Sequence, residues 1–246
     1  MENQKKFDLN ISGIGSSAGG FFNNVCIDGQ GKINGDVDCN NFTINGVGSV
    51  EGSVKTKIGK ISGKGEIKGD LQSDGFRVDG WANIDGSIAA KEVRCEGLVG
   101  INGSVNAEDV ENTGVINIKG DCSSEVFISK GAFKIGGLLN AGNIDIHLYA
   151  PCKAKEIGGE KIQVNMGRSF TLRKLIKSII PLLDINVGLC SETIEGDEIY
   201  LEYTKAKVVR GNNVTIGKGC EIELVEYKGR FEKSDKSVVT ENKKLR

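Results

Sequence analysis

Three acidic side chains occupy one position of a repeated pattern and could in principle do acid–base chemistry. They are Asp28, Asp79 and Glu96, which stand at the same place in different copies of the repeat. Carboxylates gathered on one groove are what an enzyme that cleaves polysaccharides needs. Asn45 and Ser62 occupy the same position in the intervening copies, so the acids are interrupted by neutral side chains. We therefore interpret this column as a solvated face and expect no catalytic residue in it.

A second candidate for chemistry is the glycine-rich stretch GKINGDVDC, residues 31–39, because glycine-rich loops can cradle a phosphate. The pattern returns as GSVEGSVKT at 48 and as GEIKGDLQS at 65. A phosphate-binding G-x-x-x-x-G-K-[ST] loop does not occur in the sequence. We therefore expect no nucleotide and no other cofactor, and interpret the glycines as turns of a repeat.

The cysteines and the single histidine could bind a metal if they were clustered. The seven cysteines form no C-x-x-C pair, and the only histidine is His147. Zinc sites need clustered Cys or His ligands. We therefore expect no metal, reduced thiols that mostly fill small buried sites, and a histidine at the surface or at a strand end. The cysteines are Cys26, Cys39, Cys95, Cys122, Cys152, Cys190 and Cys220.

The composition indicates a protein of many short strands, and the absence of apolar segments indicates an intracellular location. Of 246 residues 38% are hydrophobic, and 35 glycines accompany only 2 prolines without a collagen period. Lys and Arg number 32 against 33 Asp and Glu, which argues against nucleic acid as the main partner. The N-terminus has no apolar region behind its charges, and no run of about 18 apolar residues occurs. We expect an intracellular protein without a small-molecule substrate.

A 17-residue period organises most of the chain. Two glycine columns follow it and are predicted to form corners, and one apolar column between them is predicted to form a core ladder. The first glycine column is Gly29, Gly46, Gly63, Gly80, Gly97, Gly114 and Gly131. The second is Gly35, Gly52, Gly69, Gly86, Gly103, Gly120 and Gly137. The core ladder is Ile33, Val50, Ile67, Ile84, Ile101, Ile118 and Ile135.

Apolar and polar columns alternate with the period of two that strands require, and the alternation breaks once per repeat, between positions 39 and 42. The break predicts a third corner. We therefore predict an all-β, single-stranded β-solenoid with three faces and 17-residue coils, in which like residues stack in parallel ladders. Because parallel crossovers are generally right-handed, we favour a right-handed helix. The column that begins at Gly31, if it points inward, should become bulkier along the axis.

The period is lost after about Ile146 and divides the chain. We expect a tail and first cap over 1–20, a β-helix over 21–167, a basic amphipathic insertion over 168–190, and C-terminal β-coils over 191–228. Ile199 and Ile216, separated by the same interval, indicate that the period returns there. Residues 229–246 and the first eight residues are expected to be disordered, because they are charged and have few apolar side chains.

The insertion has two interpretations. Its apolar residues have helical spacing, so it is either a short helix or loop packed on the solenoid, or a patch that docks on an anionic membrane surface. The candidate membrane contacts are Arg168, Phe170, Leu172, Arg173, Lys174, Leu175, Ile176, Lys177, Ile179 and Ile180.

The units INGDV, VEGSV, IKGDL and IDGSI and the 17-residue cadence over about 25–141 resemble the bactofilins, polymer-forming cytoskeletal proteins of bacteria. The start and the end of the chain look similar to the longer Firmicute branch of that family. The resemblance implies a right-handed β-helix that assembles end to end into filaments without a nucleotide. It also implies, for some members, binding to the inner membrane and support of cell shape, wall growth, polarity or motility. The insertion and the later strands depart from the family pattern.

Polymerisation also has a physical motive, because the end coils of a solenoid expose unpaired backbone groups and apolar side chains. These ends either contact another copy, or a paralogue, or are capped within the monomer. Two other functions remain open. One is a scaffold that binds a protein partner without polymerising; the other is an enzyme, although a hexapeptide acyltransferase would need a period of 18 and a catalytic histidine. The candidate polymer contacts are Phe21, Phe22, Ile222, Leu224 and Val225.

Overall fold

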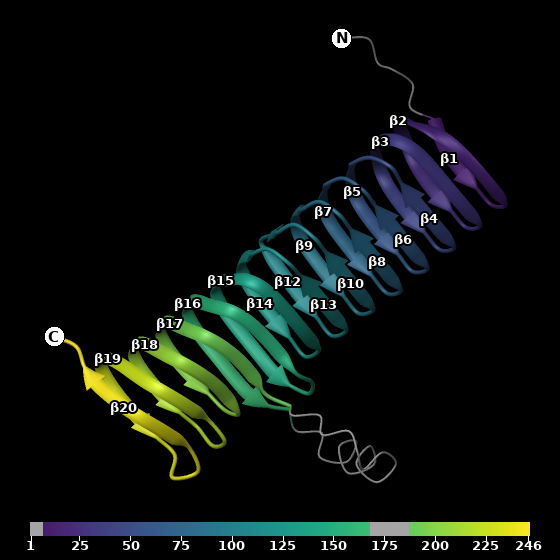
Figure 1. The fold of residues 1–246 in the computed structure, drawn as a ribbon. Coiled ribbons are helices and arrows are strands. Elements are labelled where there is room, and N and C mark those ends of the chain that lie inside the picture. The colour runs from purple at the N-terminus through teal and green to yellow at the C-terminus, as the bar shows by residue number, and fades with distance from the viewer. Residues whose placement is uncertain (1–6, 168–186) are drawn as a thin grey trace, which may run out of the picture. The chain divides into compact units, whose positions relative to one another are not determined.

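The computed structural model describes residues 7–167 and 187–246. The chain separates into two compact units, residues 1–122 and 123–246. All regular structure in the described ranges is β-strand, and the units contain about 13 turns of β-solenoid in all. The predicted all-β, single-stranded solenoid is therefore confirmed (Figure 1).

The first unit contains thirteen strands among its described residues. They are β1 (Phe7–Ile11), β2 (Ile14–Ile27), β3 (Gln30–Ile44), β4 (Val47–Val50), β5 (Val54–Ile61), β6 (Lys64–Ile67), β7 (Leu71–Val78), β8 (Trp81–Ile84), β9 (Ile88–Cys95), β10 (Leu98–Ile101), β11 (Val105–Asn106), β12 (Asp109–Asn112) and β13 (Val115–Ile118).

The strands of the first unit stack in parallel with the register that the sequence period predicts. Ile33 pairs with Val50, and Val50 pairs with Ile67. On the next face Val37 pairs with Val54, and Val54 with Leu71. Each step equals one period of the repeat, so every column of the sequence becomes a ladder along the axis. The first coil alone is shorter, because Ile14 pairs with Gln30.

Each coil has three straight segments. Bends separate β4 from β5 and β5 from β6, and within the pairing of β3 with β5 the register omits Asn40. Further along the unit the strand is interrupted at the same position, so that β11 and β12 are separate strands. Cys39 and Phe42 are both buried with Asn40 and Asn41 between them, so the third corner lies where the alternation breaks.

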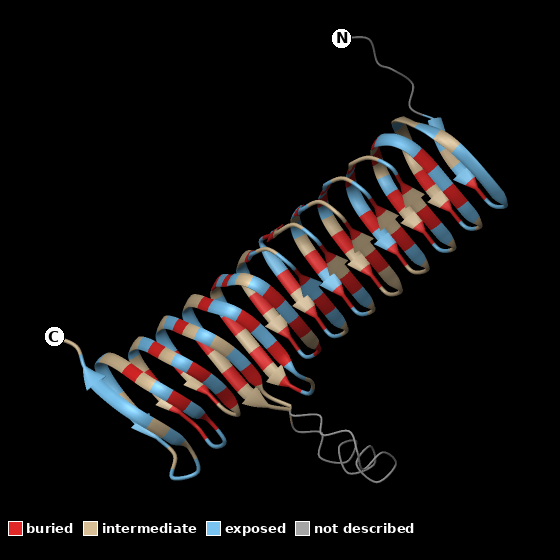
Figure 2. Ribbon diagram, viewed as in Figure 1, coloured by how far each residue is buried: buried red, intermediate tan, exposed pale blue. Residues whose placement is uncertain are grey.

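The core consists of stacked apolar side chains. Figure 2 shows that buried residues recur on successive coils. The residues of the predicted core ladder have exposures of 0–1%. The column that begins at Gly31 also points inward and grows from Gly31 to Ala82 and Ile116. Where it is glycine, neighbouring isoleucines fill the space, since a Cβ on Gly31 would lie 2.8 Å from Cγ2 of Ile27. Large side chains in the neighbouring column thus compensate for the missing side chains in this one.

The second unit stacks in the same way with coils of varying length. Its strands are β14 (Cys122–Ser129), β15 (Ala132–Leu148), β16 (Cys152–Met166), β17 (Leu189–Leu201), β18 (Thr204–Ile216), β19 (Glu221–Lys233) and β20 (Val238–Lys244). Ile199 pairs with Val214, and Ile216 pairs with Leu201. Interpreting the spacing of Ile199 and Ile216 as a return of the register is therefore wrong, because this coil is shorter than the period.

Both chain ends contain more strand than the sequence predicts. β1 and the first half of β2 occupy part of the expected tail over 1–20, and Phe7 and Asp8 are already in β1. The expected disordered tail over 229–246 is also corrected, because β19 continues to Lys233 and β20 pairs with it from Val238 to Lys244. Backbone hydrogen bonds order these charged residues, which is why hydropathy alone misses them. The expected insertion overlaps β17 at Leu189 and Cys190, and residues 168–186 lie outside the described ranges.

Candidate interaction surfaces

The column of carboxylates is held by hydrogen bonds and surface ion pairs. Asp79 contacts Arg77 at 2.6 Å and Lys60 at 3.3 Å, and Glu96 contacts Arg77 at 3.0 Å. The hydrogen bond from Arg77 lowers the pKa of Asp79 from its ordinary value. Asp28 accepts hydrogen bonds from Asn45 and Cys26. Charge on these groups is thus balanced along the ladder, an arrangement that suits a stable solvated face.

The glycine columns lie at crowded corners. At the six first-column glycines from Gly29 to Gly114, an added Cβ would strike the carbonyl oxygen of the glycine one coil earlier. Among the glycines of the two columns, only Gly35, whose φ is 109°, has a backbone conformation that itself favours glycine. At the other column glycines from Gly29 to Gly120 the lack of room decides. Gly131 lies in the bend before β15, and Gly137 lies within β15 rather than at a bend.

A ladder of small polar side chains follows the second glycine column, and sequence reasoning missed its role. Asp36 accepts a hydrogen bond from the backbone N–H of Ser53 at 2.7 Å, and the hydroxyl oxygen of Ser53 accepts one from Asp70 N–H at 3.1 Å. The contacts continue with the same geometry through Ser87 and Ser104. The signal was the restriction of this column to Asp and Ser, whose side chains readily accept backbone hydrogen bonds. Each side chain therefore ties its coil to the next.

The thiols are mostly buried and dispersed. Five of the seven cysteines are buried, Cys26 is half-buried and Cys190 is exposed. Burial raises the pKa of Cys95, Cys122 and Cys152 to about 12 and that of Cys220 to about 11. His147 lies one residue before the end of β15, 3.2 Å from Asp145. Within the described ranges no cluster of three or more His, Cys, Asp and Glu side chains could hold a metal ion.

Thiol labelling tests this arrangement. At pH 8 a pKa of about 12 leaves roughly one thiol in ten thousand ionised, so the buried cysteines should stay unreactive. We expect N-ethylmaleimide to add to Cys190 quickly and to Cys26 more slowly, since burial and its hydrogen bond to Asp28 raise the pKa of Cys26. Intact mass spectrometry should show two adducts on the native protein and seven in denaturant. Five or more adducts under native conditions would contradict the burial.

Among the described strands, none covers the N-terminal edge of the first unit along the start of β2. β1 pairs with β2 only from Phe22 to Ile27, so the backbone from Ile14 to Phe21 has a described strand neighbour on the β3 side alone. Phe7, Ile14 and Phe21 are 69%, 89% and 65% exposed. Phe22 is half-buried opposite Phe7. This edge therefore combines free backbone groups with exposed apolar side chains.

The C-terminal candidates lie inside the second unit. β20 covers them, since Ile222 pairs with Val239 and Leu224 with Glu241. Ile222 and Val225 are 2% and 0% exposed. Their assignment as terminal contacts is thus corrected. At this end, the backbone without a further described strand neighbour is that of residues 228–233 and the outer side of β20. Many side chains of this edge are charged.

The candidate membrane contacts from Arg168 to Ile180 lie outside the described residues, so their placement stays a prediction. In the part of the chain that the structure describes, no helix has the length and apolar character needed to cross a bilayer.

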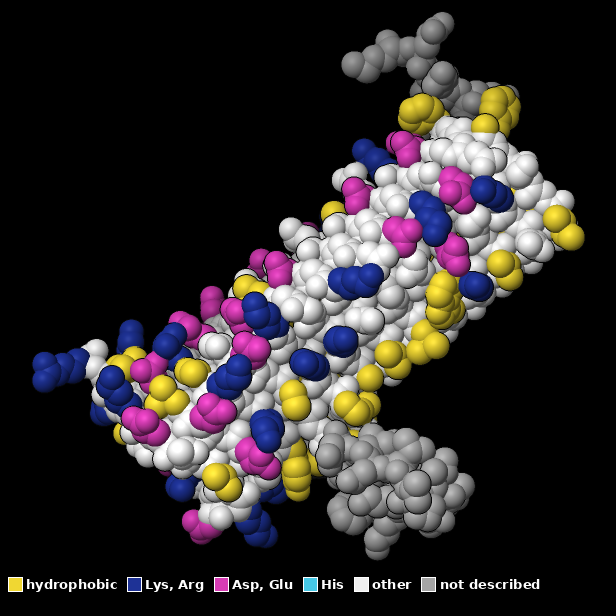
Figure 3. Space-filling view, viewed as in Figure 1, with side chains coloured by type: hydrophobic (Ala, Val, Ile, Leu, Met, Phe, Trp, Pro, Cys, Tyr) yellow, Lys and Arg dark blue, Asp and Glu magenta, His cyan; other side chains and the backbone are white. Residues whose placement is uncertain are grey.

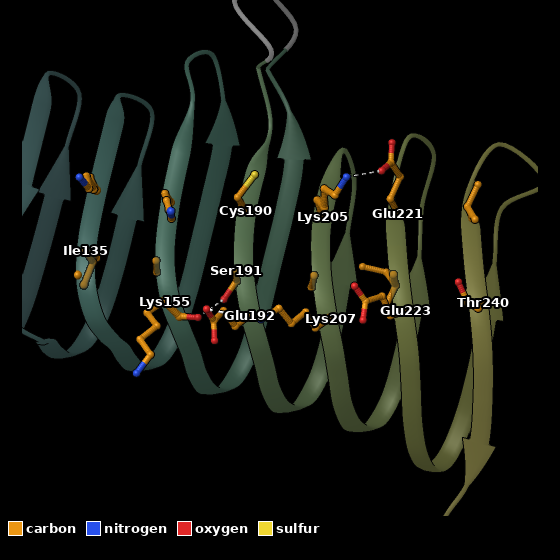
Figure 4. Close-up of a pocket in the computed structure, with 17 residues that line it drawn as sticks. Ile135, Lys155, Cys190, Ser191, Glu192, Lys205, Lys207, Glu221, Glu223 and Thr240 are labelled. Carbon is orange, nitrogen blue, oxygen red and sulfur yellow. Dashed lines mark hydrogen bonds and ion pairs between the residues drawn. The ribbon is translucent and has the colours of Figure 1, made fainter.

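A shallow concavity of about 700 Å³ lies on one face of the second unit (Figure 4). Its rims are two rows of outward side chains from successive coils, which include Lys153, Cys190, Lys205 and Glu221 in one row. Lys205 contacts Glu221 at 2.9 Å, and Lys207 in the other row contacts Glu192 at 3.7 Å. Opposite charges are paired along the rows, so the concavity presents a mixed, solvated surface.

Comparisons with known proteins give two partial matches. The chain is 48% identical over 99 residues to YhbE of Bacillus subtilis (strain 168), covering 40% of this chain and 39% of that protein. It is 41% identical over 110 residues to YhbF of the same organism, covering 44% of this chain and 42% of that protein. Both relatives are described as uncharacterized proteins, and the chain spans less than half the length of each. No family model and no solved structure matches. The chain is therefore similar to these two proteins over somewhat less than half its length.

Proposed function

We propose that this protein is a structural, non-catalytic scaffold that assembles end to end into filaments, as the resemblance to bactofilins implies. The observation that carries the proposal is the edge of β2, where the backbone from Ile14 to Phe21 has no described strand neighbour on its outer side and lies beside exposed Phe7, Ile14 and Phe21. An open sheet edge is stabilised by pairing with another strand. A second copy, or a paralogue with the same coil geometry, offers such a strand.

In this proposal the filament needs no nucleotide, because stacking satisfies the backbone without a ligand and the sequence has no phosphate-binding loop. The protein would act inside the cell, at the inner face of the membrane, and support an envelope-linked process such as cell shape or wall growth. The balanced charge of the sequence, 32 basic against 33 acidic side chains, favours self-association over nucleic-acid binding.

Sedimentation and negative-stain microscopy of the purified protein without nucleotide test the proposal. We expect filaments in the wild type. The substitution Phe21→Glu places a charge at the uncovered edge and should raise the concentration needed for assembly at least about tenfold, which corresponds to about 1.4 kcal/mol. Ile58→Glu is the matched control, because Ile58 is 60% exposed in β5, away from that edge. If the wild type stays entirely monomeric and soluble over a range of salt and protein concentrations, the proposal is contradicted and a non-polymerising scaffold is favoured.

A further inference from the structure

An exposed column of large apolar side chains runs along one face of the first unit. The outward residues that begin β4, β6, β8, β10 and β13 stack directly on one another, and the column continues through Gln30 to Ile14. We name it the Trp81 column; its residues are Ile14, Gln30, Val47, Lys64, Trp81, Leu98 and Val115. Figure 3 shows hydrophobic side chains in a line along one side of this unit.

The last three residues of the column form its continuous apolar part. Leu98 is 51% exposed and Val115 is 43% exposed, and the half-buried Trp81 lies beside them. The ammonium group of Lys64 lies 4.9 Å from the centroid of the Trp81 ring and 3.8 Å from Glu66. Lys64 therefore closes one end of the apolar part with a charge that is already partnered.

The surface beside the column allows close approach. The next outward column contains Ser49, Asn83, Gly100 and Asn117, and Gly100 lies two residues beyond Leu98 on the same strand. Leu98 thus projects beside a position without a side chain. Column positions on successive coils repeat at about 4.8 Å, and a second solenoid of the same construction presents its own side chains at the same spacing.

We propose that the Trp81 column is the lateral contact between two antiparallel copies of this protein, with Leu98 facing Leu98 and Trp81 facing Val115 of the second copy. This orientation places the largest side chain opposite a smaller one. A parallel pair would place Lys64 opposite Lys64 and oppose like charges. The inference rests on the proposed function, because it pairs filaments rather than isolated molecules.

The size of the column explains why filaments are needed. With Leu98 facing Leu98, only Trp81, Leu98 and Val115 of the two columns oppose each other. Three positions of about 4.8 Å and a width of about 10 Å give on the order of 150 Å² per copy, well below the roughly 800 Å² per partner of a stable interface. One pair of molecules should therefore separate readily. Many such contacts along two filaments act together, and the combined affinity then suffices for bundles.

The charges around the column favour a second copy over a bilayer. The neighbouring corner carries Asp28, Asp79 and Glu96, and Arg77 pairs with the last two. Glu66 lies within the face itself. An anionic membrane surface attracts clustered Lys and Arg, and this mixture of signs offers no such cluster.

Differential sedimentation tests the inference with Leu98→Lys, an exposed substitution that leaves the core untouched. Bundles pellet at low speed, whereas single filaments pellet only at high speed. We expect the wild type and the control Ile58→Lys to pellet at low speed, and Leu98→Lys to pellet only at high speed. Bundling by Leu98→Lys, or wild-type filaments that never bundle, would overturn the lateral contact alone. Absence of any high-speed pellet in the wild type would overturn both the contact and the filament proposal.

Cross-linking tests the relative orientation of the two copies, and vesicle binding tests whether the partner is a second copy or a membrane. In a background with both accessible thiols removed, Cys26→Ser and Cys190→Ser, an equal mixture of Trp81→Cys and Val115→Cys filaments should give mixed disulfide dimers on oxidation with copper phenanthroline. Trp81→Cys alone should give few dimers. Abundant dimers from Trp81→Cys alone would overturn the antiparallel orientation. Co-pelleting with phosphatidylcholine–phosphatidylglycerol vesicles that Leu98→Lys abolishes would assign the column to a bilayer and overturn pairing of copies.

Discussion

Replacing Gly86 by valine is expected to lower the melting temperature by about 10 °C and to abolish assembly. A Cβ at this corner would lie 2.6 Å from the carbonyl oxygen of Gly69 and would strike the carboxylate of Asp70. That carboxylate is fixed by the N–H of Ser87 at 2.7 Å, so it cannot move without breaking the ladder between coils. Overpacking of this kind costs about 3 kcal/mol in the free energy of unfolding. Thermal unfolding followed by circular dichroism measures the change.

The matched control for this substitution is Gly75→Val. Gly75 belongs to the same unit and lies in β7, but no atom lies within 4 Å of an added Cβ. Its melting temperature should stay within a few degrees of the wild type, because substitutions that create no clash are usually tolerated. Equal melting of the Gly86 and Gly75 variants would show that the corner has room and would refute its assignment.

Truncating Phe76 to alanine should remove about 3–5 kcal/mol from the free energy of unfolding, because the side chain is 2% exposed and its loss leaves a cavity. Phe76 also fills the space above Gly59, whose added Cβ would lie 2.9 Å from the ring. We therefore expect Gly59→Val to destabilise the wild type and to restore about 1–3 kcal/mol in the Phe76→Ala variant. Chemical denaturation of both single variants and the double variant measures this coupling.

Ile58→Ala is the control for the Phe76 experiment, since Ile58 precedes Gly59 but is 60% exposed. Its cost should be within about 0.5 kcal/mol. Simple addition of the Phe76 and Gly59 effects in the double variant would mean that the two positions do not share space, contrary to their direct pairing in one column.

The fold of the first unit could be predicted because all but its first coil have one length. With a constant step, Ile33 and Val50 fall in one column of the sequence and also pair in space. In the second unit the coil from Ile199 to Val214 is shorter than those of the first, so columns cannot be read at a fixed period. β20 escaped prediction for another reason: it is an edge strand, exposed along most of its length, and backbone pairing alone specifies it.

Exposure of the candidate polymer contacts could be predicted from the sequence at the N-terminal end but not at the C-terminal end. Phe21 precedes the repeats and lies on an uncovered edge, whereas Val225 is buried because a strand follows it that hydropathy does not reveal. The ladder through Asp36 and Ser53 does not follow from the sequence, since a small polar residue after glycine fits an exposed turn equally well. The Trp81 column could have been found in the sequence, because Trp81, Leu98 and Val115 are spaced by the period of the repeat.

The equal coils of the first unit also determine how the length of this unit can change. One coil adds about 4.8 Å to the axis, so each residue contributes only about 0.3 Å, against about 1.5 Å in an α-helix. Inserting or deleting one whole coil keeps every ladder in register. If the inserted or deleted segment is one residue shorter than a coil, the side chains that follow it on the strand change from inward-facing to outward-facing. Duplication of whole coils is therefore the route by which such a chain can be lengthened without redesigning its core. Its axial length then changes in steps of one coil.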